Sequence, residues 1–112
     1  MYRVFRIQVE VGHMRGCQLP EDAAGAFVNV YVGASTIRDA MDLAERYLTE
    51  DRYRPIDISV AYELDLDGVD YDTDEEAYPG NAELEEIQHN GGHWYGPFNT
   101  FPYDVSDSGG ES

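Results

Sequence analysis

Three segments of the sequence have patterns that are typical of β-strands, and an amphipathic segment separates the second from the third. Residues 2–11 and 26–32 are rich in β-branched and aromatic side chains, and residues 56–67 alternate throughout. A period of two is the pattern of a β-strand that buries one face. The sequence therefore predicts three strands, with a helix between the second and the third.

The alternation is most regular in the third of these strands, residues 56–67. One face carries the apolar side chains of Ile56, Ile58, Val60, Tyr62, Leu64 and Leu66. The other face carries Asp57, Ser59, Ala61, Glu63, Asp65 and Asp67. Because successive side chains of a strand point to opposite faces of the sheet, we expect the acidic set to form an outer face.

The amphipathic segment predicts a helix that is capped by Ser35 or Thr36. The Thr36-x-x-Asp39 spacing matches a capping box, in which a hydroxyl oxygen accepts a hydrogen bond from a backbone N–H. A helical repeat places one set of residues on a buried face: Ile37, Ala40, Met41, Ala44, Tyr47 and Leu48. The water-facing set is Arg38, Asp39, Asp42, Glu45 and Arg46. Since the residue before a proline avoids helical backbone, we expect the helix to end at Tyr53-Arg54-Pro55.

These elements predict a small fold of the α+β class. A strand–helix–strand unit leaves its two strands parallel, and the first strand can lie between them, antiparallel to both. The result is a ββαβ sheet with one main helix, or half of a ferredoxin-like sandwich. Because such a sheet has exposed edges, we expect the C-terminal residues or a second subunit to complete it.

The C-terminal part of the chain predicts a short second helix, Ala82–Gln88. Asn81 can cap it, and Leu84 and Ile87 would form its buried side. The helix would be followed by a turn at Asn90-Gly91-Gly92.

An aromatic-rich extension covers residues 93–103. It contains two prolines, which favours an extended segment or an edge strand over a central strand. We expect one domain over residues 1–103, with an acidic loop at 63–80, and a disordered tail at 104–112. Residues 12–25, which contain three glycines and a proline, are expected to form a loop.

The charge of the chain is divided unequally along the sequence. All seven basic residues are arginines that precede Pro55, where eight acids balance them to a net charge of −1. From Pro55 onward there are fifteen acids and no lysine or arginine, a net charge of −15. Such a field repels nucleic acids and acidic membranes and attracts basic partners. Adaptation to high salt also produces acidic, lysine-poor chains, but it would spread acids over the whole surface.

The acidic run after residue 62 is the candidate partner-binding surface. Carboxylates at positions i and i+2 of an extended chain lie about 6.6–6.8 Å apart, a spacing that resembles successive phosphates along a nucleic-acid strand. Aromatic side chains near the run would serve as anchors. The candidate residues are Glu63, Asp65, Asp67, Asp70, Tyr71, Asp72, Asp74, Glu75, Glu76, Tyr78, Trp94 and Tyr95. The alternative is a solvated loop that only keeps the protein soluble.

Metal sites are weakly indicated. An EF-hand that begins at Asp70 would have Glu75 where glycine is required and Asn81 where glutamate is required. The pairs His13/Cys17 and His89/His93 could supply zinc ligands, but neither spacing is that of a zinc finger. We therefore expect no cofactor and no metal.

Catalysis is not indicated either. No nucleophile signature surrounds Cys17, and no glycine-rich phosphate loop with a lysine is present. The chain is expected not to be an enzyme. The sequence near Met1 contains no apolar run typical of a signal peptide, and a single cysteine is compatible with a reducing compartment, so a cytoplasmic location is expected.

The sequence favours an acidic inhibitor that binds and blocks a basic protein partner without contacting nucleic acid or membrane. The first interpretation is a bacterial immunity protein that neutralises a toxin, for which a nuclease is one candidate. The alternatives are a phage-encoded, anti-CRISPR-like DNA mimic that blocks a host nucleic-acid-binding complex, and a non-inhibitory dimeric adaptor.

Overall fold

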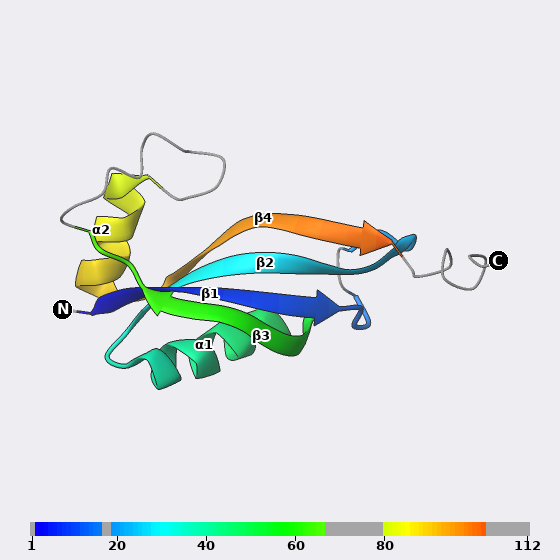
Figure 1. Cartoon of the computed structure of the whole chain (residues 1–112), viewed down its shortest axis with the longest axis horizontal. Helices are drawn as coiled ribbons and strands as arrows, with labels where there is room; N and C mark the ends of the chain where they lie inside the picture. Colours follow the sequence, from blue (N-terminus) through cyan, green and yellow to red (C-terminus); the bar gives the residue numbers. More distant parts are fainter. Residues whose placement is uncertain (1, 17–18, 67–79, 103–112) are drawn as a thin grey trace.

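The computed structural model describes residues 2–16, 19–66 and 80–102, and within them a four-stranded sheet with two helices (Figure 1). The elements are, in chain order, β1 (Arg3–Gly12), β2 (Ala23–Ala34), α1 (Ile37–Glu50), β3 (Arg54–Glu63), α2 (Asn81–Asn90) and β4 (His93–Pro102). The strand order is β3-β1-β2-β4, and every neighbouring pair is antiparallel. The predicted α+β class is confirmed, as is the position of the first strand between the second and the third.

The main core lies between the sheet and α1. On this side β1 and β2 pair apolar residues along their whole length, from Phe5 opposite Val32 to Val11 opposite Ala26, and these side chains are buried. The helix contributes the buried residues Ala40, Ala44 and Leu48. Because Ala40 and Ala44 have small side chains, the helix backbone can approach the strands closely.

The start of α1 agrees with the sequence and its end does not. The Oγ1 atom of Thr36 accepts a hydrogen bond from the backbone N–H of Asp39 at 3.1 Å, as predicted for a cap. Ile37, which was expected on the buried face, is 40 % exposed because it lies in the first turn, at the end of the sheet. The helix ends at Glu50, before the predicted stop, because Arg52 adopts a left-handed backbone with φ 71°.

The regular alternation predicted for residues 56–67 is wrong, because β3 contains two irregularities. Val60 lies opposite Gln8 whereas Ile58 lies opposite Val9, so Ser59 is an extra residue, and Ile56 is extra in the same way. An extra residue moves the following side chains to the other face of the sheet. Ile58 consequently packs against the α1 core. The exposed apolar residues of β3 are Ile56 at 49 %, Val60 at 40 % and Tyr62 at 38 %. The strand ends at Glu63, four residues before the predicted end.

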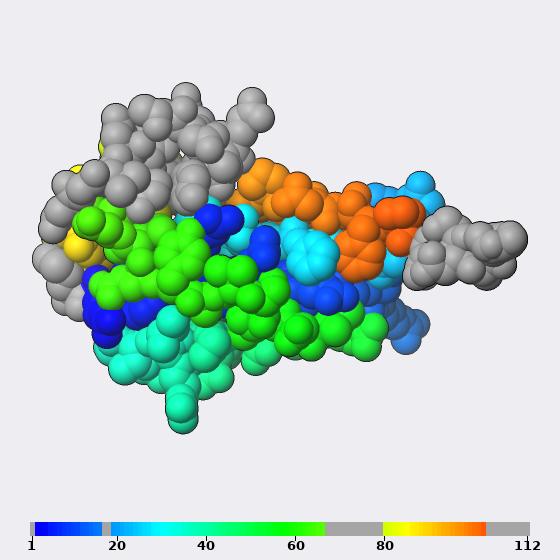
Figure 2. All heavy atoms as spheres, viewed as in Figure 1, coloured from blue at the N-terminus to red at the C-terminus, as the bar shows by residue number. Residues whose placement is uncertain are grey.

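Val60 and Tyr62 therefore lie on the sheet face opposite α1. Figure 2 shows this face, on which side chains of β3 (green), β1 (blue), β2 (cyan) and β4 (orange) lie side by side. Here Arg6 donates a hydrogen bond from Nη1 to the Tyr62 hydroxyl at 2.7 Å, and its guanidinium lies over the Tyr62 ring.

α2 stands across one end of the sheet and is longer than predicted (Figure 1). Leu84 and Ile87 are buried, as expected, in a second apolar cluster with Val4, Tyr31 and Leu64. Asn81 is not the cap: Gly80 occupies that position and no side-chain cap bond forms. The helix ends at Asn90 and is followed by Gly91, whose φ of 78° favours glycine.

β4 completes the sheet at the outer edge of β2, which confirms the prediction of an edge strand for the aromatic segment. A register shift between Val28 and Val30 of β2 coincides with Pro97, which lies between Tyr95 and Phe98. Proline cannot donate to a ladder, so its place on an edge strand costs the sheet little.

Candidate functional site

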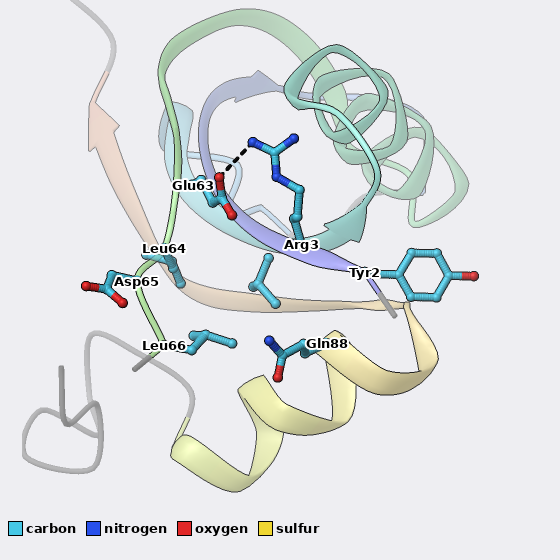
Figure 3. Close-up of a pocket in the computed structure, with 8 residues that line it drawn as sticks. Tyr2, Arg3, Glu63, Leu64, Asp65, Leu66 and Gln88 are labelled. Atoms are coloured by element: carbon cyan, nitrogen blue, oxygen red, sulfur yellow. Dashed lines mark hydrogen bonds and ion pairs between the residues drawn. The ribbon is translucent and has the colours of Figure 1, made fainter. Parts of the chain in front are cut away.

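A pocket of about 520 Å³ opens at the end of the sheet where β1 begins, β3 ends and α2 packs (Figure 3). Among the described residues, it is lined by Tyr2, Arg3, Val4, Glu63, Leu64, Asp65, Leu66 and Gln88. Its volume is within the range of pockets that hold small ligands or single side chains. Two of its residues, Glu63 and Asp65, belong to the predicted partner-binding surface.

The antiparallel pairing of β1 with β3 creates an ion pair at the pocket. Arg3 Nη2 donates a hydrogen bond to Glu63 Oε1 at 2.7 Å, and Arg3 Nη1 donates to the backbone oxygen of Ser35 at 3.1 Å. The hydrogen bond from Arg3 lowers the pKa of the Glu63 carboxyl, and the same bond raises the pKa of Arg3. The arginine at this pocket is therefore already engaged by acceptors of the protein itself.

The same pairing separates Arg3 from Arg52 and Arg54. Arg54 lies opposite Gly12, at the far end of β1 from Arg3. A strand of ten residues spans about 30 Å, so these arginines occupy opposite ends of the sheet.

The floor of the pocket is apolar and is fixed by backbone hydrogen bonds. The Leu64 N–H donates to the Val4 oxygen at 2.9 Å, and the Tyr2 N–H donates to the Gln88 oxygen at 2.7 Å. Leu64 is buried and Leu66 is half-buried against the second apolar cluster. These contacts attach the end of β3 and the end of α2 to the start of β1.

Figure 3 shows how the side chains around the pocket are directed. Leu64 and Leu66 point toward α2, and the amide of Gln88 points toward Leu66. Asp65 points to the other side of the chain. One oxygen of Glu63 accepts from Arg3, and the other is directed toward the floor. The pocket thus combines an apolar floor with a carboxylate oxygen and an amide.

The surface around the pocket is anionic. The exposed acids of the β3 end and of α2 are Glu63, Asp65, Glu83, Glu85 and Glu86. Residues 55–66 and 80–102 contain no lysine or arginine. The described residues of the β3 end and of α2 therefore carry acids and no arginine or lysine, whereas the neighbouring α1 carries Arg38 and Arg46.

The two described aromatic candidates, Trp94 and Tyr95, lie on opposite faces of the sheet, so they cannot both anchor one partner on one surface. Trp94 is opposite Tyr31, whose ring centroid is 5.8 Å from that of Trp94, and it packs against the α2 cluster. Tyr95 is opposite Val30 and packs against the α1 core. The error follows from adjacency: neighbouring residues of a strand face opposite sides.

Tyr95 has a structural role in holding the end of α1. Its hydroxyl donates to Asp51 Oδ2 at 2.5 Å, next to the last turn of the helix. Burial raises the pKa of the Tyr95 hydroxyl well above its usual range, and the hydrogen bond to Asp51 adds to the shift.

The remaining candidates lie outside the described residues: Asp67, Asp70, Tyr71, Asp72, Asp74, Glu75, Glu76 and Tyr78. Cys17, most of the acidic loop and the tail at 104–112 also lie outside the described residues. The regular spacing of carboxylates at positions i and i+2 of an extended chain therefore stays a prediction.

The described histidines do not form a metal site. The His13 ring hydrogen-bonds to the Ala23 oxygen, whereas His93 stacks on Tyr47 with ring centroids 3.8 Å apart. Over residues 2–16, 19–66 and 80–102, no three His, Cys, Asp or Glu side chains gather closely enough to hold a metal ion. The described helices include none with the length and apolar character needed to cross a membrane.

Comparisons of the chain with protein-family models, with curated proteins and with solved structures gave no match.

Sequence reasoning missed six residues of the pocket: Tyr2, Arg3, Val4, Leu64, Leu66 and Gln88. The predicted antiparallel pairing of the first and third strands could have placed Arg3 near Glu63. No comparable signal exists for Gln88, because the position of α2 depends on the packing of Leu84 and Ile87 against the sheet.

Proposed function

We propose that the protein is an acidic inhibitor that binds a basic protein partner through the anionic end of its sheet. One observation carries the proposal: the exposed residues Glu63 and Asp65 line a pocket whose arginine is already paired, and α2, which also lines it, carries three further exposed acids. Complementary charge accelerates association and excludes acidic partners, and a pocket at the centre of the surface can hold an anchoring side chain. The setting that fits best is a cytoplasmic bacterial immunity protein that neutralises a toxin.

The experiment begins with capture of a partner from source cells on the immobilised protein. Capture is done at low salt and repeated at about 0.5 M salt, where the Debye length falls to about half its physiological value. The captured protein is then purified and its activity is titrated with the inhibitor. We expect a partner of basic surface, stoichiometric loss of its activity, and weaker capture at high salt.

The control is a variant with Glu63, Asp65, Glu83, Glu85 and Glu86 replaced by the corresponding amides. All five side chains are exposed, so the fold should be retained. A partner whose surface is not basic, or one whose inhibition ignores both salt and the five substitutions, would show that the proposal is wrong. A captured nucleic-acid-binding complex that the protein displaces from DNA would instead favour the DNA mimic.

A dimeric adaptor is the second candidate, and the edge strand β3 favours it. Ile56, Val60 and Tyr62 expose apolar surface on this strand. Against it, the two extra residues and Pro55 are features that disfavour pairing of an edge with another strand. Mass measurement of the purified protein decides: a dimer that Val60→Lys converts to a monomer supports the adaptor, whereas a monomer excludes it.

A further inference from the structure

We propose that the pocket between β3 and α2 receives one arginine side chain of the basic partner. This inference rests on the proposed function and specifies which chemical group the site recognises. Three features support it: the apolar floor of the pocket, the carboxylate of Glu63 beside it, and the pairing of Arg3 with acceptors of the protein itself.

The floor suits the aliphatic part of a long basic side chain. Val4 and Leu64 are buried and Leu66 is half-buried, and together they form one wall of a cavity of about 520 Å³. Arginine and lysine cover apolar surface with their methylene groups and keep the charged group at a polar rim. A small inorganic cation would leave this apolar wall without a contact.

The rim of the pocket offers hydrogen-bond acceptors to a cationic group. Glu63 gives one oxygen to Arg3, and its second oxygen is directed toward the floor (Figure 3). An ionised carboxylate has about four lone-pair sites, so one carboxylate can bridge two guanidinium groups. Gln88 places an amide oxygen and an amide NH₂ on the opposite wall.

Arginine fits this geometry better than lysine. A guanidinium is planar and carries five N–H donors, so it can pair with the Glu63 carboxylate through two of them and keep others for neighbouring acceptors of the rim. An ammonium is a compact and strongly hydrated point charge that gains less from an apolar floor. An anionic ligand is disfavoured because Arg3 already donates to Glu63 and to Ser35, and the neighbouring exposed side chains are acids.

The test is an NMR titration of the ¹⁵N-labelled protein with N-acetyl-arginine amide. The expected result is a saturable shift of the amide signals of Leu64, Leu66 and the Gln88 side chain. N-acetyl-citrulline amide has nearly the same shape without the charge, and we expect it to bind at least tenfold more weakly. N-acetyl-lysine amide should bind with intermediate affinity.

Two substitutions that remove the same charge from β3 provide the matched controls. Glu63→Gln removes the carboxylate at the pocket, and we expect it to weaken arginine binding at least tenfold. Asp57→Asn changes the net charge equally, but Asp57 is exposed and lies opposite Glu10, away from the pocket, so we expect less than a threefold effect. A ¹⁵N spectrum of each variant, compared with that of the wild-type protein, shows whether the fold is retained.

The inference is overturned if the shifts scatter over all exposed acids, if citrulline binds as well as arginine, or if Asp57→Asn weakens binding as much as Glu63→Gln. It is also overturned if the signals of the pocket residues do not shift at ligand concentrations up to 50 mM. A dissociation constant above that concentration corresponds to a binding free energy weaker than about 2 kcal/mol. The proposed function fails separately. If a basic partner is inhibited equally well by the Glu63→Gln variant, the proposed function is supported and the arginine pocket is wrong. If arginine binds at the pocket but no basic partner is captured, the arginine pocket is supported and the proposed function is wrong.

Discussion

The two helices of this protein pack on the sheet in different ways. α1 runs along the strands and covers paired apolar residues from Phe5 to Val11 of β1. α2 stands across one end and contributes only Leu84 and Ile87 to a smaller cluster. The larger of the two described pockets opens beside α2, and the apolar cluster between α1 and the sheet has more buried members than the α2 cluster.

The difference separates two roles of the molecule. Burial of large apolar area supplies most of the stability of a domain, and the α1 side holds most of that area. The α2 end holds few buried apolar side chains but carries exposed carboxylates and the pocket. We therefore expect substitutions under α1 to act mainly on stability, and substitutions around the pocket to act mainly on binding.

The largest expected effect tests this division directly. Replacement of a buried leucine by alanine costs about 2–5 kcal/mol, and less where the surroundings can collapse into the cavity. We expect Leu48→Ala, in α1, to lie in the upper half of that range and Leu84→Ala, in α2, in the lower half. Urea unfolding of both variants measures the difference. An equal or greater loss for Leu84→Ala would contradict the division.

Gly33 tests how closely α2 approaches the sheet. A Cβ atom at this position would lie 2.8 Å from the Ile87 backbone oxygen and 3.0 Å from Ile87 Cγ2. Because the backbone of α2 would have to move to make room for this atom, we expect Gly33→Ala to lower the free energy of unfolding by about 1–3 kcal/mol. Gly12→Ala is the control, since its Cβ would meet only the flexible ends of Ile56 and Arg54, at 3.0 and 3.1 Å. Equal losses for the two variants would show that α2 is not held against the sheet as described.

Tyr95→Phe removes the hydroxyl that holds the end of α1. The hydrogen bond to Asp51 is partly exposed, so we expect a loss of about 1 kcal/mol at neutral pH. The raised pKa of Tyr95 means that its contribution is complete below the ordinary tyrosine pKa of 10.0 and is lost as the pH rises above it. Unfolding between pH 8 and 11 should therefore be steeper in pH for the wild-type protein than for Tyr95→Phe. Parallel curves would contradict this assignment.

Glu63→Gln should have the smallest effect on stability. Exposed ion pairs contribute little, because both groups are well solvated and must be ordered to meet. The lowered pKa of Glu63 places its contribution above the ordinary value of 4.5, and it is lost as the pH falls through the lowered pKa. We expect the urea midpoint at pH 7 to change no more than its error. A large loss would give Glu63 a structural role and weaken its assignment to binding.

The sequence predicted the positions of the helices and strands better than the sheet face to which each side chain points. The period of two in residues 2–11, the cap at Thr36 and the aromatic edge strand follow from local rules, and all three are confirmed. The extra residues in β3 could not be predicted, because Ser59 and Ile56 fit a regular strand equally well and their displacement arises only from pairing with β1.

The site was predicted in part for a related reason. A high density of acids identified Glu63 and Asp65, since charge is visible in the sequence itself. It could not show that Glu63 pairs with Arg3 while Asp65 points away, because that difference depends on strand register and on the position of α2. Trp94 and Tyr95 were grouped as neighbours in sequence, although a strand directs neighbours to opposite faces.

The central claim is that the negative charge acts at one end of the sheet and not as a property of the whole surface. It is tested by the affinity of the captured basic partner for two variants of equal charge. One variant neutralises Glu63, Asp65, Glu83, Glu85 and Glu86, and the other neutralises the exposed Glu21, Asp22, Glu45, Glu50 and Asp57. Each set changes the net charge from −16 to −11. We predict that the first variant loses most of the binding and its salt dependence while the second retains both, and equal losses in the two variants would contradict the claim.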